Sequence, residues 1–142
     1  MSTTPEYRAA SPVLLLTFNR PDTTAAVVEA LRLVAPEQVF VFSDGPREGV
    51  EGEAELVAET RRVIDEGLDW SPRVQQRYND RNQGLFAGVT GALDWFFSRV
   101  PEGIILEDDC VPHPDFFAYC DDLLARYRDD ERVWCVSGDN SV

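Results

Sequence analysis

The chain of 142 residues has little positive charge: 13 Lys and Arg residues against 26 Asp and Glu residues give a formal net charge of −13 at pH 7. No basic stripe is present that could neutralise a phosphate backbone, which argues against nucleic acid or an anionic membrane as the main partner. An anionic phosphate ligand would also be repelled unless a cation lies between it and the protein. The charge balance therefore predicts that any phosphate-bearing ligand binds together with a metal ion.

Cysteines, targeting signals and long apolar runs are also scarce. The three cysteines are odd in number and lack metal-ligand spacing, so reduced thiols are expected. The first residues have neither the basic nor the apolar region of a signal peptide, and the longest apolar run falls far short of the roughly 20 residues of a membrane span. These absences predict a cytoplasmic protein without a transmembrane segment, and leave peripheral attachment at the inner membrane open.

Glycine-rich phosphate loops are missing as well. Asn19-Arg20-Pro21-Asp22 follows the first apolar run, where a Rossmann fingerprint would have its glycines, and no Walker A motif occurs. The sequence therefore predicts that a phosphate group is not bound by a glycine loop.

Short apolar runs alternate with amphipathic segments of helical spacing along the whole chain. Apolar runs of this kind are typical of buried parallel strands. Strands are expected at residues 13–18, 39–42, 74–78, 104–106 and 133–136, and helices at 21–34, 54–64, 85–100 and 114–127. This order predicts an α/β fold, a doubly wound, mostly parallel sheet of about five strands with helices on both faces. Residues 1–142 are expected to form a single domain, with residues 1–11 as a flexible N-terminus.

Three consecutive carboxylates, Glu107, Asp108 and Asp109, end the fourth apolar run. The carboxyl end of a parallel strand is where open α/β sheets have their ligand crevice. If the extended geometry continues, Glu107 and Asp109 point to one side and Asp108 to the other. Adjacent carboxylates repel each other at a cost on the order of 1 kcal/mol, which a simple turn does not require. Two oxygen ligands on one side suit Mg²⁺ or Mn²⁺ held together with a substrate phosphate.

Polar clusters at residues 17–20, 43–44 and 79–84 follow the other expected strands. Because these loops open on one edge of a parallel sheet, the clusters should converge with the carboxylate triplet. Each has a structural alternative that stays open. Asn19 can cap a helix, Asp44 can belong to a turn, and Gly84 can serve a loop before a helix.

Other residues near these clusters have plainer expected roles. Arg20 and Arg81 are basic residues available to a phosphate or a base, whereas Arg47 is interpreted as surface charge. His113 precedes Pro114 and is expected to begin a helix. Cys110 is interpreted as a small core residue, because a thiolate there would face three carboxylates.

The ordered set of motifs resembles the nucleotide-sugar-binding half of GT-A glycosyltransferases of the family 2-like kind, over residues 12–140. The likeness rests on the first strand with Asn19-Arg20, on Asp44 after the second strand, and on Asn82-Gln83-Gly84-Leu85. Glu107-Asp108-Asp109 corresponds to the DxD motif of these enzymes. Its Glu-Asp-Asp form, followed by residues 112–117, is similar to the N-acetylglucosaminyltransferase I family.

This resemblance implies an enzyme that binds a UDP-sugar through Mn²⁺ or Mg²⁺ and transfers the sugar to a hydroxyl of a glycan or other acceptor, with inversion. Asp109 would ligate the metal directly, with Glu107 beside it, and Asp108 would act on the ribose and the water shell of the metal. The nucleotide-binding residues that the resemblance implies are Thr17, Phe18, Asn19, Arg20, Asp44, Asn82, Gly84, Leu85 and Asp108. The acceptor-binding half of such enzymes would begin near Asp139, so the catalytic base is expected outside this chain.

Two other functions remain open. A non-catalytic nucleotide- or sugar-binding module, or a donor-binding fragment, would share the pocket without the transfer. A nucleotidyltransferase would share the architecture and the metal, but usually has a glycine-rich loop bearing Lys or Arg after its first strand, which is not found here.

Overall fold

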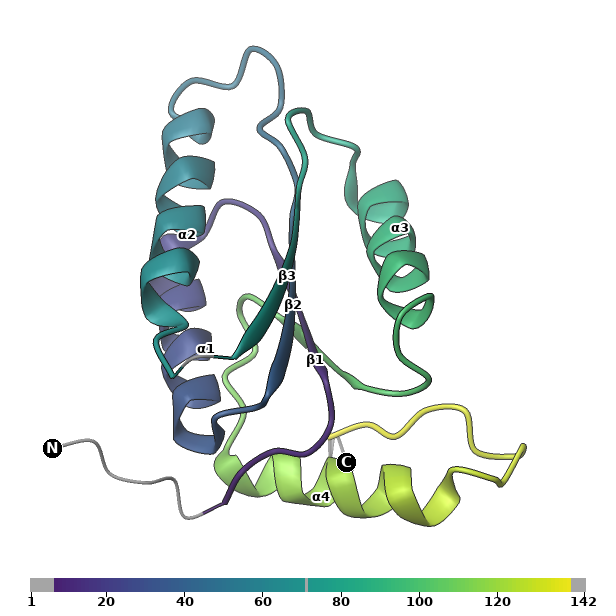
Figure 1. The fold of residues 1–142 in the computed structure, drawn as a ribbon. Helices are drawn as coiled ribbons and strands as arrows, with labels where there is room; N and C mark the ends of the chain where they lie inside the picture. The colour runs from purple at the N-terminus through teal and green to yellow at the C-terminus, as the bar shows by residue number, and fades with distance from the viewer. Residues whose placement is uncertain (1–6, 71, 139–142) are drawn as a thin grey trace, which may run out of the picture.

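The computed structural model describes residues 7–70 and 72–138. Strands and helices alternate strictly along the chain (Figure 1). The elements are β1 (Val13–Thr17), α1 (Pro21–Val34), β2 (Gln38–Ser43), α2 (Glu53–Gly67), β3 (Arg73–Tyr78), α3 (Leu85–Phe97), β4 (Ile104–Glu107) and α4 (Pro114–Tyr127). None of the helices in the described residues is long and apolar enough to cross a membrane.

The four strands form one parallel sheet in the order β3-β2-β1-β4. The predicted α/β class and parallel pairing are confirmed. The predicted number of about five strands is wrong for residues 7–70 and 72–138, because residues 133–136 form no strand there. Trp134 in this run is 93% exposed, and its indole N–H donates to the carbonyl of Glu131. An apolar run becomes a strand only where a neighbouring strand pairs with its backbone N–H and C=O groups. Residues 133–136 pair with no strand among the described residues.

Side chains of the strands alternate between two apolar clusters, one on each face of the sheet. The larger cluster packs α1, α2 and α4 against residues such as Val13, Leu15 and Val41. The smaller one packs α3 alone against Leu14 and Phe40. Figure 1 shows α1 and α2 on one side of the sheet and α3 on the other, with α4 crossing below. The predicted helices on both faces are confirmed.

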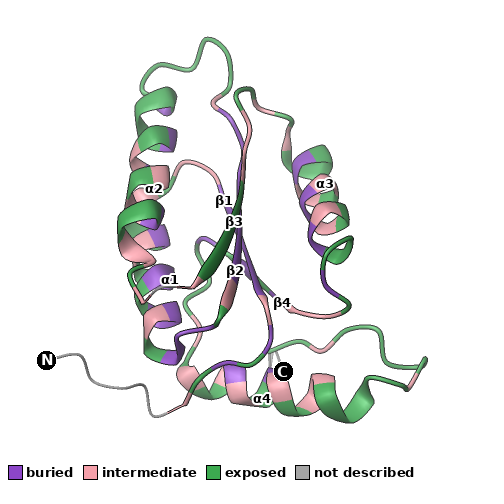
Figure 2. Cartoon of the chain, in the orientation of Figure 1, coloured by how far each residue is buried: buried purple, intermediate pink, exposed green. Residues whose placement is uncertain are grey.

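β4 lies at the edge of the sheet, and its burial alternates along the strand (Figure 2). Ile104 and Leu106 face the larger cluster, whereas Ile105 is 39% exposed on the other face. The expectation of a strand buried throughout is therefore wrong for β4. In α3 as well, the apolar side chains of Leu85 and Phe97 are exposed.

The segment before β1 is tied to the rest of the domain. The Asp121 carboxylate of α4 accepts hydrogen bonds from the backbone N–H groups of Ala10 (2.8 Å) and Ser11 (2.9 Å) and from the Tyr7 hydroxyl. Ala9 is buried and donates to the Val34 carbonyl at 2.8 Å. Residues 7–11 of the expected N-terminal segment are therefore hydrogen-bonded to the domain, and residues 1–6 lie outside the described residues.

The starts of α1 and α4 differ in their capping. Asn19 does not cap α1, because the N-cap residue is Arg20 and no described side chain caps this helix. Pro21 stands in the first turn of α1 with Asp22 beside it, near the positive end of the helix dipole. His113 caps α4, because its imidazole Nδ1 accepts the backbone N–H of Asp115 at 3.3 Å. The interpretation of His113 as a helix-start residue is confirmed.

Candidate functional site

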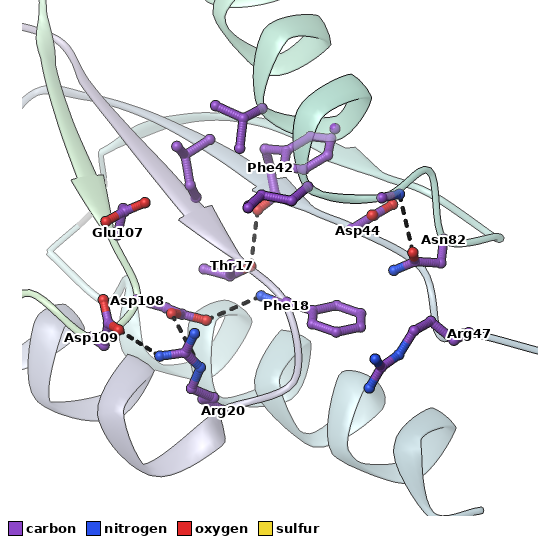
Figure 3. Close-up of a pocket in the computed structure, with 15 residues that line it drawn as sticks. Thr17, Phe18, Arg20, Phe42, Asp44, Arg47, Asn82, Glu107, Asp108 and Asp109 are labelled. Carbon is purple, nitrogen blue, oxygen red and sulfur yellow. Dashed lines mark hydrogen bonds and ion pairs between the residues drawn. The ribbon is translucent and has the colours of Figure 1, made fainter. Parts of the chain in front are cut away.

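A pocket of about 400 Å³ opens where the carboxyl ends of the strands meet (Figure 3). Its walls come from the ends of β1 and β2, from the loop before α3 with its first turns, and from the carboxylate triplet after β4. The predicted site residues that line it are Thr17, Phe18, Arg20, Asp44, Asn82, Gly84, Leu85, Glu107, Asp108 and Asp109. Asn19 is the exception: its amide donates to the Glu53 carboxylate at 3.1 Å.

The strand register is what brings these residues together. Thr17 pairs with Ser43, so β1 and β2 end side by side, and Leu16 pairs with Glu107. The Thr17 hydroxyl donates to the Phe42 carbonyl at 2.9 Å. The triplet therefore begins beside the end of β1, and the convergence predicted for the clusters is confirmed.

The three carboxylates of the triplet lie in different surroundings. Glu107 and Asp109 are exposed, whereas Asp108 is 6% exposed and accepts the backbone N–H of Phe18 at 3.2 Å. Glu107 and Asp109 share a side as predicted, although a turn after β4 brings this about rather than continued strand geometry.

Burial and charge shift the pKa values of Asp108 and Asp109 in opposite directions. Burial raises the pKa of Asp108, and the Phe18 N–H and the Arg20 charge offset only part of that effect. The hydrogen bond from Arg20, whose Nη1 lies 2.5 Å from Oδ2 of Asp109, lowers the pKa of Asp109. Asp109 is therefore the carboxylate more readily available as an anion at the pocket mouth.

Glu107, Asp109 and Cys110 form the group whose ligand atoms could share one metal ion, since these atoms lie within 4.8 Å of one another. The two carboxylates are hard donors of the kind that Mg²⁺ and Mn²⁺ prefer. Cys110 is exposed, so its interpretation as a core residue is wrong. Partial desolvation of its thiol and the hydrogen bond to Asp109 raise its pKa, and a neutral thiol is a poorer ligand for a hard cation than the two carboxylates.

Asp44 lies across the pocket from the triplet (Figure 3) and is buried. Its Oδ1 accepts from the N–H of Gly45 (2.9 Å) and from the Asn79 amide (3.1 Å), and both carboxylate oxygens lie 3.1 Å from the N–H of Gln83. Asp44 thus lines the pocket and at the same time holds the loop before α3 in place. The turn alternative for Asp44 is partly confirmed, because the carboxylate does bind its own loop.

Asn82 and Gly84 shape the start of α3. Asn82 donates to the Gly45 carbonyl at 2.9 Å and accepts from the N–H of Gly84 at 3.0 Å. Gly84 has φ +81°, a left-handed backbone that glycine adopts at little cost. Both residues therefore have the loop role that the sequence left open, and both also line the pocket.

Glu53 is a residue of the site that the sequence did not single out. At the start of α2 it is 2% exposed, and its carboxylate accepts from the backbone N–H of Arg47 (2.7 Å), from the Arg47 guanidinium and from Asn19. The hydrogen bond from Arg47 is the main cause that lowers the pKa of Glu53. Arg47 is thereby held at the pocket, with Cζ 5.8 Å from the centroid of the Phe18 ring. The interpretation of Arg47 as plain surface charge is wrong.

Arg61 of α2 is a second residue near the site that the sequence pattern did not indicate. Its guanidinium donates to the Ser43 hydroxyl (2.9 Å) and to the carbonyls of Asn79 (2.7 Å), Ser43 (3.2 Å) and Asp44 (3.3 Å). It therefore fixes the carboxyl ends of β2 and β3 relative to each other. Arg81, by contrast, approaches the site with its backbone, against Gly45.

Comparison with protein-family models, curated proteins and solved structures finds no match for this chain. The functional conclusion therefore depends on the chemistry of the pocket.

Proposed function

We propose that this chain binds a UDP-sugar together with Mn²⁺ or Mg²⁺ in the pocket and serves as the donor site of a GT-A-type glycosyltransferase. The observation that carries this proposal is the juxtaposition in Figure 3: exposed carboxylates at the end of β4 face the same pocket as two arginines and the Asp44 loop. A divalent cation and an anionic, partly polar ligand are what such a lining accommodates together.

Asp109 and Glu107 are the residues that would hold the metal, because their carboxylates are exposed and close to each other. The bound cation would supply neutralisation of the diphosphate, including the charge that develops on the UDP leaving group. Asp108 keeps the end of β1 beside the triplet through the Phe18 N–H.

The chain's own cations complement an anionic diphosphate. Arg20 and Arg47 line the pocket, and Glu53 orients Arg47 over the Phe18 ring. Guanidinium groups suit phosphate oxygens because their N–H groups form a planar fork. The Asp44 and Asn82 side of the pocket is left for the nucleoside, where carboxylate and amide oxygens can accept from ribose hydroxyls or a base.

A nucleotide-sugar-binding module without transfer activity is the second candidate. Transfer to a hydroxyl requires a general base beside the sugar. Among the described residues that line the pocket, Glu107 and Asp109 are committed to the cation, Asp108 to the β1 loop and Asp44 to the loop before α3. Asp139, near which the acceptor-binding half would begin, lies outside the described residues.

The test is calorimetric titration of UDP into the protein with Mn²⁺ and with EDTA, for the wild type, Asp109→Ala and Asp122→Ala. Asp122 is an exposed carboxylate of α4 that pairs only with Arg126 among the described residues, and serves as the matched control. We expect binding that needs Mn²⁺, is weakened about tenfold or more by Asp109→Ala, and is unchanged by Asp122→Ala.

Equal binding in EDTA, or none in either condition, would contradict the proposal. UDP release from a panel of UDP-sugars in Mn²⁺ then separates the two candidates. Slow release above the rate without protein favours the enzyme, whereas tight binding without release favours the module.

A further inference from the structure

The Arg20 guanidinium lies against Asp109, one of the two carboxylates to which the cation is assigned, and close to Asp108 (Figure 3). Its Nη1 is 2.5 Å from Oδ2 of Asp109, and its Nε is 3.9 Å from Oδ1 of Asp108. The Arg20 side chain is 54% exposed, so it can move without disturbing the core. Its backbone stays fixed, because the Arg20 carbonyl accepts the N–H of Thr24 in the first turn of α1 at 3.1 Å.

The charges around Arg20 do not balance. Among the described residues, Arg20 is the one cation paired with the triplet, at Asp109 and Asp108, so one positive charge stands against three carboxylates and two negative charges are left uncompensated. Glu107 has no hydrogen-bond or ion-pair partner for its side chain within residues 7–70 and 72–138, so it contributes one of them. A divalent cation would satisfy this cluster better than a single guanidinium does.

We propose that Arg20 is a tethered counter-ion that competes with a divalent cation for the Asp109 carboxylate, so that a cation bound by Asp109 and Glu107 displaces it. An Asp109 oxygen that accepts a charge-assisted hydrogen bond at 2.5 Å has no room for a cation at coordination distance in the same direction. Since Arg20 also lines the pocket, the displaced guanidinium stays beside the pocket, where an anionic ligand meets it. This inference rests on the proposed metal site and adds that Arg20 lowers its affinity for the metal alone.

The experiment uses Mn²⁺ alone as the probe, without nucleotide. Electron paramagnetic resonance of free Mn²⁺ gives the dissociation constant for the wild type, Arg20→Gln, Arg62→Gln and Asp109→Asn. Arg62 pairs with Glu59 and Glu66 on the outer face of α2, so Arg62→Gln controls for the change in net charge. We expect Arg20→Gln to bind Mn²⁺ about three- to thirty-fold more tightly than the wild type. Arg62→Gln should stay within about twofold of the wild type, and Asp109→Asn should lose the site.

The outcomes separate the two proposals. If the wild type binds Mn²⁺ and Arg20→Gln binds it equally or more weakly, the counter-ion inference is overturned while the proposed metal site stands. If neither binds Mn²⁺, both are overturned. Binding by Arg20→Gln alone would support both.

A second readout follows Arg20 directly. In a ¹H–¹⁵N spectrum of arginine side chains, the Nε resonance of Arg20, assigned through its loss in Arg20→Gln, should shift or broaden when diamagnetic Mg²⁺ is added. The Nε resonance of Arg62 should stay unchanged. An Arg20 signal that does not respond while the Asp109 amide shifts would overturn the inference, because it would mean that the cation binds without moving the guanidinium.

Discussion

Asp108 and Asp109 are neighbours in the chain, yet their surroundings give them different chemistry. Asp108 is buried beside the N–H of Phe18, and burial raises its pKa. Asp109 is exposed beside Arg20, which lowers its pKa. The ionised form of Asp108 therefore lowers the stability of the fold, whereas Asp109 is available to a ligand. Residues that lower stability are expected where a sequence is selected for function.

Asp108→Asn should stabilise the protein at neutral pH. Because the folded-state pKa of Asp108 is raised, its ionised form destabilises the folded state at pH values above that pKa, and the penalty disappears as the pH falls through it. An asparagine can still accept the Phe18 N–H, but does not ionise. We expect a melting temperature about 2–6 °C higher at pH 7 and no difference near pH 3.5, measured by circular dichroism.

Asp122→Asn is the control for this measurement, because Asp122 is exposed and pairs with Arg126. A lower melting temperature of Asp108→Asn at pH 7 would show that the Asp108 carboxylate is a net stabilising group. The same variant should bind Mn²⁺ less tightly than the wild type if the negative charge of the triplet attracts the cation.

At the scale of elements, the site depends on how closely the loop after β2 approaches the loop before α3. A Cβ atom on Gly45 would lie 2.5 Å from the backbone of Arg81. The carbonyl of Gly45 also accepts the Asn82 amide. Glycine at this position is therefore what lets Asp44 reach the second loop.

Gly45→Ala should separate the two loops and weaken the hydrogen bonds of Asp44. We expect a loss of about 2–4 kcal/mol in the free energy of unfolding, together with weaker binding of UDP in Mn²⁺. Gly49→Ala is the matched control: Gly49 has φ +78° and a Cβ atom added there would meet nothing within 4 Å, so only backbone strain of about 1 kcal/mol is expected. Urea unfolding and calorimetry measure both quantities, and equal losses in the two variants would contradict the close-approach explanation.

Elements with a strong local pattern were predictable from the sequence, and contacts between distant elements were not. The runs that became β1 and β2 are mostly apolar, and nearly all their residues are buried, because both faces of a central strand are covered. Residues 133–136 have the same local pattern, but a strand also needs a partner edge, which no local pattern supplies. The exposure of Ile105 likewise follows from the position of β4 at the edge of the sheet.

The same distinction applies to the site. The carboxylate triplet could be found because three adjacent charges after an apolar run are costly and therefore informative. Glu53 and Arg61 could not, because an acidic first turn and an arginine on an amphipathic helix are ordinary surface features in sequence. Only the fold shows that Glu53 reaches Asn19 and that Arg61 reaches Asn79.

At the scale of the whole molecule, Asp121 joins the segment before β1 to α4. Burial opposes ionisation of Asp121, but hydrogen bonds from Ser11, Tyr7 and Ala10 outweigh it, and the pKa of Asp121 lies below its usual range. A lowered folded-state pKa means that the carboxylate stabilises the fold above its ordinary pKa near 4. This contribution is lost as the pH falls through the folded-state value.

Asp121→Ala should therefore lower the free energy of unfolding by about 2 kcal/mol at pH 7, with the difference from the wild type shrinking below about pH 4. Asp122→Ala removes the neighbouring exposed carboxylate and should stay within about 0.5 kcal/mol of the wild type. Urea unfolding at pH 7 and pH 3 measures the pair. Indistinguishable stabilities of the two variants at pH 7 would contradict the anchoring role of Asp121.

The two apolar clusters of the core differ in size, and α3 packs on the smaller one. α3 is held to the sheet by the smaller apolar cluster and by a hydrogen bond from Arg77 to the Gly91 carbonyl, and its first turn leaves Leu85 82% exposed. A helix with few buried contacts opens locally at a lower free energy than the whole domain. Because Asp44 and Asn82 hold the loop before α3, the part of the pocket wall expected to open first is the exposed first turn of α3, while the triplet stays in place on β4. A ligand that spans from Gly84 to Asp109 would lengthen the time that this wall stays closed. The residence time of such a ligand would then depend on the rate of local opening of α3 as well as on the strength of its contacts.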